Sequence, residues 1–223
     1  DSGAPHIVEH AVLNGSRKYP VKEPFLALMK GSLCTFLNAM TYPDRTLFPL
    51  ASRNPRDFHN LMDVYLDAVF NPRLTRLAFM QEGWHYTAAA DGLALGGIVY
   101  NEMLGAAAAP ESVLVDELET ALFPDNVYGR RAGGDPEAIP ALTYDAFRAF
   151  HRRYYHPANS RSVIYGDVDV DACLAHLDEF FRPYAGRRRD TVRIDAHPPW
   201  RRPRRARASY AVPADAAGDG RSF

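Results

Sequence analysis

Apolar residues change their spacing repeatedly along this chain of 223 residues. Between residues 57 and 70 they recur every three or four positions, which predicts an amphipathic helix with one buried face. Residues 33–41 and 46–52 instead carry β-branched and aromatic side chains on either side of a Tyr-Pro-Asp turn signal, which predicts two strands. Pro49 places the second strand at a sheet edge or a bulge. The fold must therefore combine helices with neighbouring strands.

The rest of the chain continues this mixture. Further helices are predicted at 5–13, 22–30, 96–109, 111–123, 143–155 and 171–181, and further strands at 83–88 and 160–167. Asp169 or Asp171 is expected to cap the last helix. Gly and Pro residues mark 124–142 as a loop. Because the strands are often adjacent rather than alternating with helices, we predict an α+β fold with a largely antiparallel sheet and helices packed on it.

The composition changes after Tyr184, where Arg, Pro and Asp become frequent. This change predicts one domain at 1–185, followed at 186–223 by a linker and the start of a further unit. The chain begins with Asp, and its first predicted helix starts within a few residues of that end. We therefore expect a piece of a longer polypeptide; the alternative is a processed mature chain.

The net charge of −1 favours neither a nucleic-acid nor a membrane partner. No apolar run reaches the roughly 18 residues of a membrane span. Cys34 and Cys173 are too few for a disulfide framework or a cysteine-based zinc site, and they suit a reducing compartment such as a bacterial cytoplasm or an organelle matrix. The arginine-rich stretch 186–207 could contact nucleic acid, but it lacks a patterned aromatic platform, so a solvated linker is the preferred interpretation.

The segment PHIVEH, residues 5–10, carries the clearest chemical pattern. On a helix, His6 and His10 share a face, and this spacing suits two imidazoles on one metal ion. Glu9 lies beside them, in the reversed order of the His-Glu-x-x-His zinc motif. A catalytic zinc takes three protein ligands and a water, which a nearby glutamate can deprotonate. The alternative is two surface histidines at this spacing by chance. The apolar neighbours predict partial burial, which is costly for unpartnered ionisable groups.

The third ligand does not belong to this motif. An acidic residue in an apolar, buried segment is expected, and Glu102 in GIVYNEMLG fits best. The residues alone leave the choice open. The other acidic candidates lie in more polar or loop-like contexts, where solvated or helix-end charges are expected: Glu82, Glu111, Glu117, Glu119 and Glu137.

PHIVEH, followed by GSRKYPVKEPF and KGSLCTFLNAMTYPDRT, resembles the insulinase/pitrilysin family of zinc metallopeptidases, in its presequence-protease branch. The resemblance continues through QEGWHY, GIVYNEMLG and LFPDNVYG to about Tyr184. It implies Zn²⁺ held by His6, His10 and Glu102, with Glu9 activating a zinc-bound water. The implied activity is that of a zinc metalloendopeptidase that hydrolyses unstructured peptides of the targeting-peptide type.

The resemblance also implies that LNAMT is an edge strand. Leu37, Asn38 and Ala39 would then pair with the substrate backbone as an added strand. The alternative for this segment is an ordinary half-buried strand. The implied fold is a metallohydrolase unit of the insulinase/processing-peptidase type, which works with the C-terminal half of the same full-length polypeptide. The alternative function is a non-catalytic peptide-binding or scaffold subunit of the same fold. Leu104 departs from the family, which often has lysine there.

Overall fold

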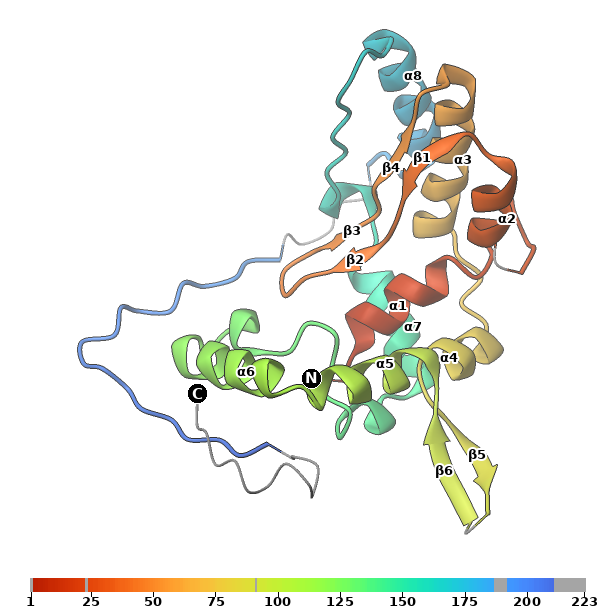
Figure 1. Ribbon diagram of the computed structural model, residues 1–223. Helices are drawn as coiled ribbons and strands as arrows, with labels where there is room; N and C mark the ends of the chain where they lie inside the picture. Colours follow the sequence, from red (N-terminus) through yellow and green to blue (C-terminus); the bar gives the residue numbers. More distant parts are fainter. Residues whose placement is uncertain (1, 23, 91, 187–191, 211–223) are drawn as a thin grey trace.

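The computed structural model describes residues 2–22, 24–90, 92–186 and 192–210. Helices and strands occupy the part of the chain before residue 185 (Figure 1). The α-helices are α1 Ala4–Val12, α2 Pro24–Gly31, α3 Pro55–Phe70, α4 Arg76–Glu82, α5 Ile98–Ala107, α6 Pro110–Leu122, α7 Tyr144–Tyr154 and α8 Val170–Phe181. The strands are β1 Cys34–Leu37, β2 Met40–Thr41, β3 Thr46–Leu47, β4 Leu50–Ser52, β5 His85–Ala89 and β6 Gly92–Gly96.

Every strand pair among the described residues is antiparallel. β1 pairs with β4, β2 with β3, and β5 with β6. The first two pairs form one long hairpin that is interrupted in the middle, where Pro49 separates β3 from β4. Leu37 lies opposite Leu50, and the N–H of Asn38 donates to the carbonyl of Pro49 over 3.1 Å. The α+β class is confirmed, with the described strands forming three two-stranded pairs.

Local signals explain where several helices begin. The side chain of Asn54 accepts from the backbone N–H of Asp57 at the start of α3. Thr75 and Thr143 cap α4 and α7 in the same manner. Of the two aspartates predicted to cap α8, Asp169 is the residue that does so, over 3.0 Å.

Some elements differ from the sequence prediction. Residues 160–167 lie in no strand of the described chain, and Tyr165 is fully exposed. A strand-like pattern needs a partner strand, and the described residues supply none. α4 and β6 were not predicted, because seven residues give little helical periodicity and Gly-Leu-Ala-Leu-Gly has weak strand propensity. The predicted loop 124–142 contains two short 3-10 turns, Val127–Gly129 and Ile139–Ala141.

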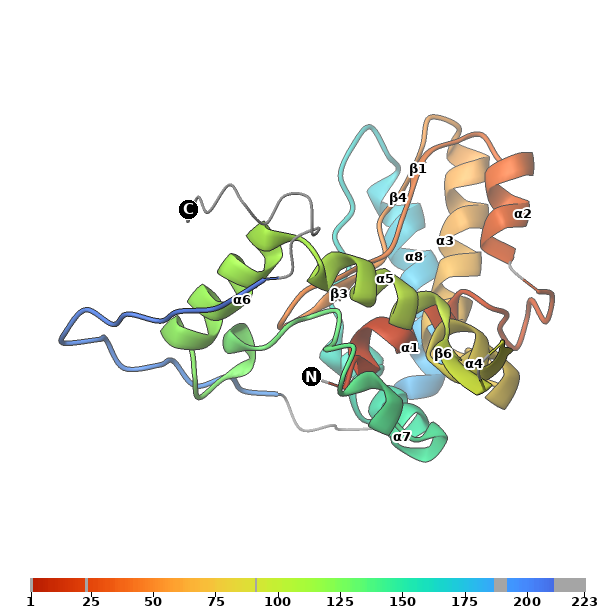
Figure 2. The same ribbon diagram turned by 60° about the horizontal axis from the view of Figure 1, so that its bottom comes forward.

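Helix α1 lies at the centre of the molecule. It contacts α4, α5 and α7 on one side and β2 on the other (Figures 1 and 2). Ile7, Val8 and Val12 are fully buried, and the core around them includes Val99 from α5 and Phe147 from α7. The packing of these buried side chains stabilises a nine-residue helix that would be unstable on its own. The His-x-x-Glu-His segment is therefore presented by a rigid, packed helix.

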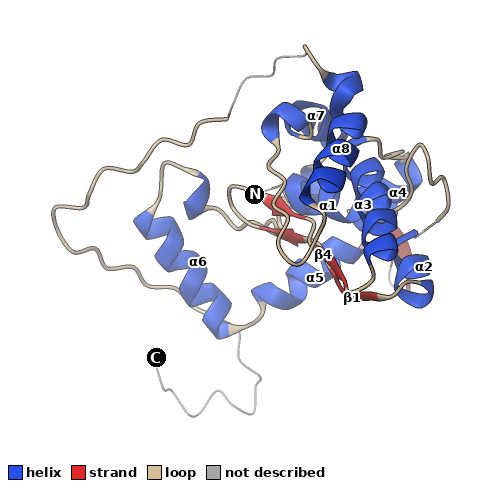
Figure 3. Ribbon diagram, turned by 90° about the horizontal axis from the view of Figure 1, so that it is seen from above, coloured by secondary structure: helices blue, strands red, loops and turns tan. Residues whose placement is uncertain are grey.

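The far end of the described chain lies apart from this core. α6 has no buried residue, and the described segment 192–210 runs beside it without helix or strand (Figures 2 and 3). The indole N–H of Trp200 donates to the carbonyl of Leu122 over 3.0 Å. The division into 1–185 and 186–223 remains a prediction. In the part of the chain described, no helix is both long and apolar enough to cross a bilayer.

Candidate active site

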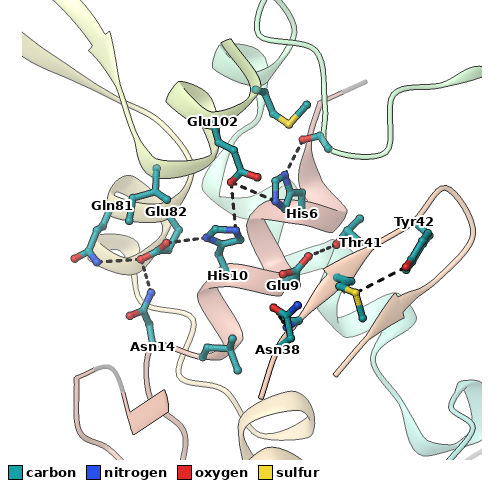
Figure 4. Close-up of a pocket in the computed structure, with 16 residues that line it drawn as sticks. His6, Glu9, His10, Asn14, Asn38, Thr41, Tyr42, Gln81, Glu82 and Glu102 are labelled. Carbon is teal, nitrogen blue, oxygen red and sulfur yellow. Dashed lines mark hydrogen bonds and ion pairs between the residues drawn. The ribbon is translucent and has the colours of Figure 1, made fainter. Parts of the chain in front are cut away.

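Two elements bring three potential metal ligands together. His6 and His10 project from one face of α1, with ring centroids 4.8 Å apart. Glu102 comes from α5, and its Oε2 lies 3.7 Å from His6 Nε2 and 3.8 Å from His10 Nε2 (Figure 4). The ligand atoms of the three residues all lie within 4.8 Å of one another. Over the described ranges, this is the one such group of His, Cys, Asp and Glu side chains.

The junction of α4 and α5 sets the position of Glu102. Gly97, at φ 139°, precedes α5, and a Cβ there would lie 2.1 Å from the carbonyl oxygen of Gly83. Only glycine fits this close approach, since the φ value is also unfavourable for L side chains. Val99 and Met103 are buried on the same helix. The Glu102 side chain itself is 54% exposed, so the segment expected to be buried is buried on one face only.

Each histidine directs the same ring nitrogen toward Glu102. His6 Nδ1 lies 3.2 Å from the carbonyl oxygen of Gly133, and His10 Nδ1 lies 3.3 Å from Glu82 Oε2. Because a carbonyl and a carboxylate only accept, the neutral form of each imidazole that suits these contacts has its proton on Nδ1 and its lone pair on Nε2. This arrangement is typical of metal-binding histidines. Two imidazole nitrogens and a carboxylate oxygen form a donor set that fits zinc.

Glu82 is a residue whose role the sequence did not reveal. It was expected to be a solvated or helix-end charge. It does end helix α4, but it is 4% exposed and lies against His10. Its Oε1 accepts from Asn14 over 2.6 Å and from Gln81 over 2.9 Å. An acidic residue in the last turn of a helix opposes the helix dipole. Because α4 was not predicted from the sequence, this signal was not available before the structure.

The electrostatics of this pair agree with its geometry. Burial alone raises the pKa of Glu82, but the hydrogen bonds with His10 and Asn14 outweigh it and hold the pKa below its usual value. Burial lowers the pKa of His10, but the hydrogen bond with Glu82 and the nearby carboxylates outweigh it and raise the pKa. Glu82 therefore carries its negative charge next to the imidazole of His10.

Glu9 lies beside the ligand group without belonging to it. It is 5% exposed, and its Oε2 accepts a hydrogen bond of 2.5 Å from the Thr41 hydroxyl on β2. In Figure 4, Glu9 and Glu82 lie on opposite sides of His10. Glu9 therefore contacts the hairpin through Thr41, whereas Glu82 extends from α4 on the other side of His10.

All of these side chains line one cavity of about 870 Å³. Two of the three predicted substrate-binding residues, Asn38 and Ala39, also line it, whereas Leu37 does not. β1 pairs with β4 along one edge, and among the described residues no strand lies along its other edge. The lining residues are His6, Glu9, His10, Leu13, Asn14, Asn38, Ala39, Met40, Thr41, Tyr42, Gln81, Glu82, Ile98, Glu102, Met103 and Gly133.

Comparison with known proteins agrees with this architecture. Residues 1–89 match the family model described as insulinase (peptidase family M16), and residues 141–210 match the peptidase M16 inactive domain. The crystal structure of pitrilysin superposes on 87% of this chain and 20% of its own, with a TM-score of 0.67 and 21% identity, which shows a shared fold. The chain belongs to the insulinase family of peptidases.

Within that family, several of its relatives are named presequence proteases. Presequence protease 1 of Arabidopsis thaliana is 54% identical over 183 residues, which cover 80% of this chain and 17% of the relative. The mitochondrial presequence protease of Mus musculus is 40% identical, over 91% of this chain and 20% of the relative. Protein HypA of Clostridium perfringens is 53% identical, over 80% and 19%. The chain thus spans about a fifth of the length of these relatives.

Proposed function

We propose that this chain is the zinc-bearing unit of a metalloendopeptidase that hydrolyses unstructured peptides. The observation that carries the proposal is the convergence of His6, His10 and Glu102, with Glu9 held beside them. Its relatives in Arabidopsis thaliana and Mus musculus are named presequence proteases, which supports targeting peptides as the substrate class. We assign His6, His10 and Glu102 as the zinc ligands and Glu9 as the general base.

The chemistry divides between the metal and the protein. A zinc ion held here would act as a Lewis acid toward the scissile carbonyl and lower the pKa of a water. Glu9 takes the proton of the attacking water and later gives it to the leaving amine. Thr41 holds Glu9 Oε2, so we assign the proton transfer to Oε1. Burial of Glu9 keeps bulk water from competing for that carboxylate.

We propose that the peptide binds as an added strand at Leu37, Asn38 and Ala39. Main-chain hydrogen bonds would supply the affinity, with little demand on the peptide's sequence. The support is that Asn38 and Ala39 line the cavity that contains the proposed ligands. A peptide paired at this edge would have its backbone beside that cavity. An unfolded peptide offers an unpaired backbone along its whole length, whereas a folded protein pairs most of its own, which accounts for the proposed preference.

We also propose that this unit works with a C-terminal half of the same polypeptide. The support is that the chain corresponds to about a fifth of the length of its relatives. Neither a nucleic acid nor a membrane is part of the proposal. Peptide cleavage is therefore best assayed both for this chain and for the longer polypeptide.

Bound zinc per chain is the direct test of the proposal. Elemental analysis of the purified protein is expected to give about one zinc, and Glu102→Ala is expected to lose most of it. Glu9→Gln is expected to keep the zinc and abolish cleavage of an unstructured peptide. If the folded protein held no zinc even after addition of excess metal, the proposal would be wrong. The non-catalytic peptide-binding or scaffold subunit would then be the better interpretation.

A further inference from the structure

A second carboxylate, outside the proposed ligand set, contacts His10. Glu82 is 72 residues away in sequence, yet its Oε2 lies 3.3 Å from His10 Nδ1. We propose that Glu82 is the positioning residue of His10, which holds the imidazole in the tautomer that presents Nε2 and increases its donor strength toward a metal. This inference rests on the proposed zinc site and adds a determinant of its affinity.

The hydrogen bonds around Glu82 orient its Oε2 toward His10. The carboxylate is buried, and its Oε1 is occupied by the side-chain amides of Asn14 and Gln81. A buried carboxylate is costly unless donors satisfy it, and here three side chains do so. Asn14 lies two residues after the end of α1, so the same network connects the end of this helix to α4.

Glu82 is placed to orient His10 rather than to bind the metal itself. Its Oε2 faces Nδ1, whereas Glu102 Oε2 faces Nε2 of the same ring. The two nitrogens of the imidazole point in different directions. A metal ion bound at Nε2 would therefore lie on the side of Glu102 and away from Glu82. Figure 4 shows His10 between Glu82 and Glu102.

The two histidines differ in the charge of this partner. His6 Nδ1 faces the neutral carbonyl of Gly133, and His10 Nδ1 faces a carboxylate. A carboxylate partner raises the basicity of a histidine ligand, and outer partners of this kind are worth about 10–100-fold in metal affinity. We therefore expect the loss of Glu82 to act on His10 and to leave His6 unchanged.

The test measures zinc affinity of the full chain by competition with a chromophoric chelator. Glu82→Gln keeps the size of the side chain and removes the charge, and it is expected to bind zinc about 10-fold or more weakly. Glu117→Gln, an exposed glutamate on α6, is the matched control and is expected to bind as the wild type does. Glu102→Ala defines the result for a lost ligand.

A second readout separates positioning from general structural damage. In the zinc-loaded chain, the Nδ1 proton resonances of His6 and His10 are followed by NMR. Glu82→Gln is expected to shift or broaden the His10 signal and leave the His6 signal in place. A merely structural role for Glu82 would disturb both histidines or neither.

The outcomes are distinct from those of the parent proposal. A wild-type chain that binds no zinc overturns the proposed function itself. A wild-type chain that binds zinc, with Glu82→Gln equally tight and its His10 signal unchanged, overturns only the role of Glu82. If Glu82→Gln does not fold, Glu82→Asp decides, because it keeps the charge and withdraws it by one methylene. Weaker zinc binding with a shifted His10 signal supports the inference, and wild-type values for both contradict it.

Discussion

At the scale of single residues, the buried carboxylate of Glu9 depends on a hydrogen bond from a distant part of the chain. Thr41 is the described hydrogen-bond donor to the buried Glu9, and it lies 32 residues away. A buried carboxylate that loses its donor is left with an unsatisfied acceptor, which costs about 1–3 kcal/mol. The hydroxyl of Thr41 therefore belongs to the proposed catalytic arrangement as a group that orients the base.

Replacing Thr41 tests that orientation. Thr41→Val keeps the shape and removes the hydroxyl, and we expect kcat for peptide cleavage to fall about 10-fold or more with the zinc content unchanged. Thr41→Ser restores a hydroxyl and is expected to recover most of the rate. Steady-state kinetics together with zinc analysis give the answer. Equal kcat values for Thr41→Val and the wild type would exclude this role.

Asp63 on α3 provides a pH-dependent contact away from the site. It accepts from the Lys18 ammonium group and, over 2.5 Å, from the Tyr19 hydroxyl. Burial raises its pKa, but these hydrogen bonds and the charge of Lys18 outweigh it and lower the pKa below the usual value. A carboxyl whose folded-state pKa is lowered adds stability above its unfolded pKa of about 3.9. That stability is lost as the pH falls through the folded-state value.

Asp63→Asn is therefore expected to lower the free energy of unfolding by about 1 kcal/mol at pH 6. Because asparagine does not titrate, the difference from the wild type should narrow as the pH falls from 5 to 3. Urea unfolding at several pH values measures it. Asp178→Asn is the control, because Asp178 pairs with Arg182 at a surface where its side chain is 76% exposed. A difference for Asp63→Asn that stayed constant with pH would contradict the assignment.

At the scale of elements, the site depends on how α5 meets α4. Gly97 allows the start of α5 to lie close to the end of α4. A Cβ at this position would lie 2.1 Å from the carbonyl oxygen of Gly83 and would prevent that contact. The contact sets the start of α5 and hence the position of Glu102, five residues further on. By contrast, the helix and turn signals that begin α3, α4 and α7 are local, and they act without any contact to the site.

Two glycine substitutions, one at the N-cap of α5 and one within the helix, distinguish the effect of the junction from that of the helix. Gly97→Ala is expected to destabilise the fold by about 2 kcal/mol or more and to reduce bound zinc, because φ is positive and the space is filled. Gly105→Ala has open space around its Cβ and is expected to be neutral or to stabilise by about 0.5–1 kcal/mol. Thermal unfolding and zinc analysis compare the two. Similar behaviour of both variants would remove the junction as the cause.

At the scale of the whole molecule, the proposed ligands connect separate parts of the fold. α1 supplies two of them and α5 the third, so an ion held there would bind the folded chain better than the unfolded one. Such binding stabilises by about 2.7 kcal/mol when the free ligand is at 100 times its Kd. Metal content and folding stability should therefore change together.

Zinc is accordingly expected to raise the melting temperature of the chain by about 5–10 °C, since each kcal/mol shifts Tm by about 2–4 °C at this size. A chelator should reverse the shift. Glu102→Ala should melt near the wild-type metal-free temperature and respond little to zinc. Differential scanning calorimetry measures all three. An equal zinc response in Glu102→Ala would mean that the metal binds elsewhere.

The sequence by itself determined the features that depend on near neighbours. The spacing of His6, Glu9 and His10 predicted a shared helix face, because residues four apart on a helix are adjacent whatever surrounds them. Pro49 marked an irregularity in the predicted strand 46–52, and that strand is divided there into β3 and β4. Asp169 was one of two candidate caps for α8. Each of these follows from backbone geometry within a few residues.

Tertiary structure decided the rest. It brought Glu102 within 4 Å of both histidines and buried Glu82 behind His10, although the local pattern of Glu82 indicated a solvated charge. It also left residues 160–167 outside any described strand, despite their pattern. The physical reason is the same in each case. Burial and strand pairing depend on contacts between segments far apart in the chain, and packing around α1 fixes those contacts where local propensity cannot.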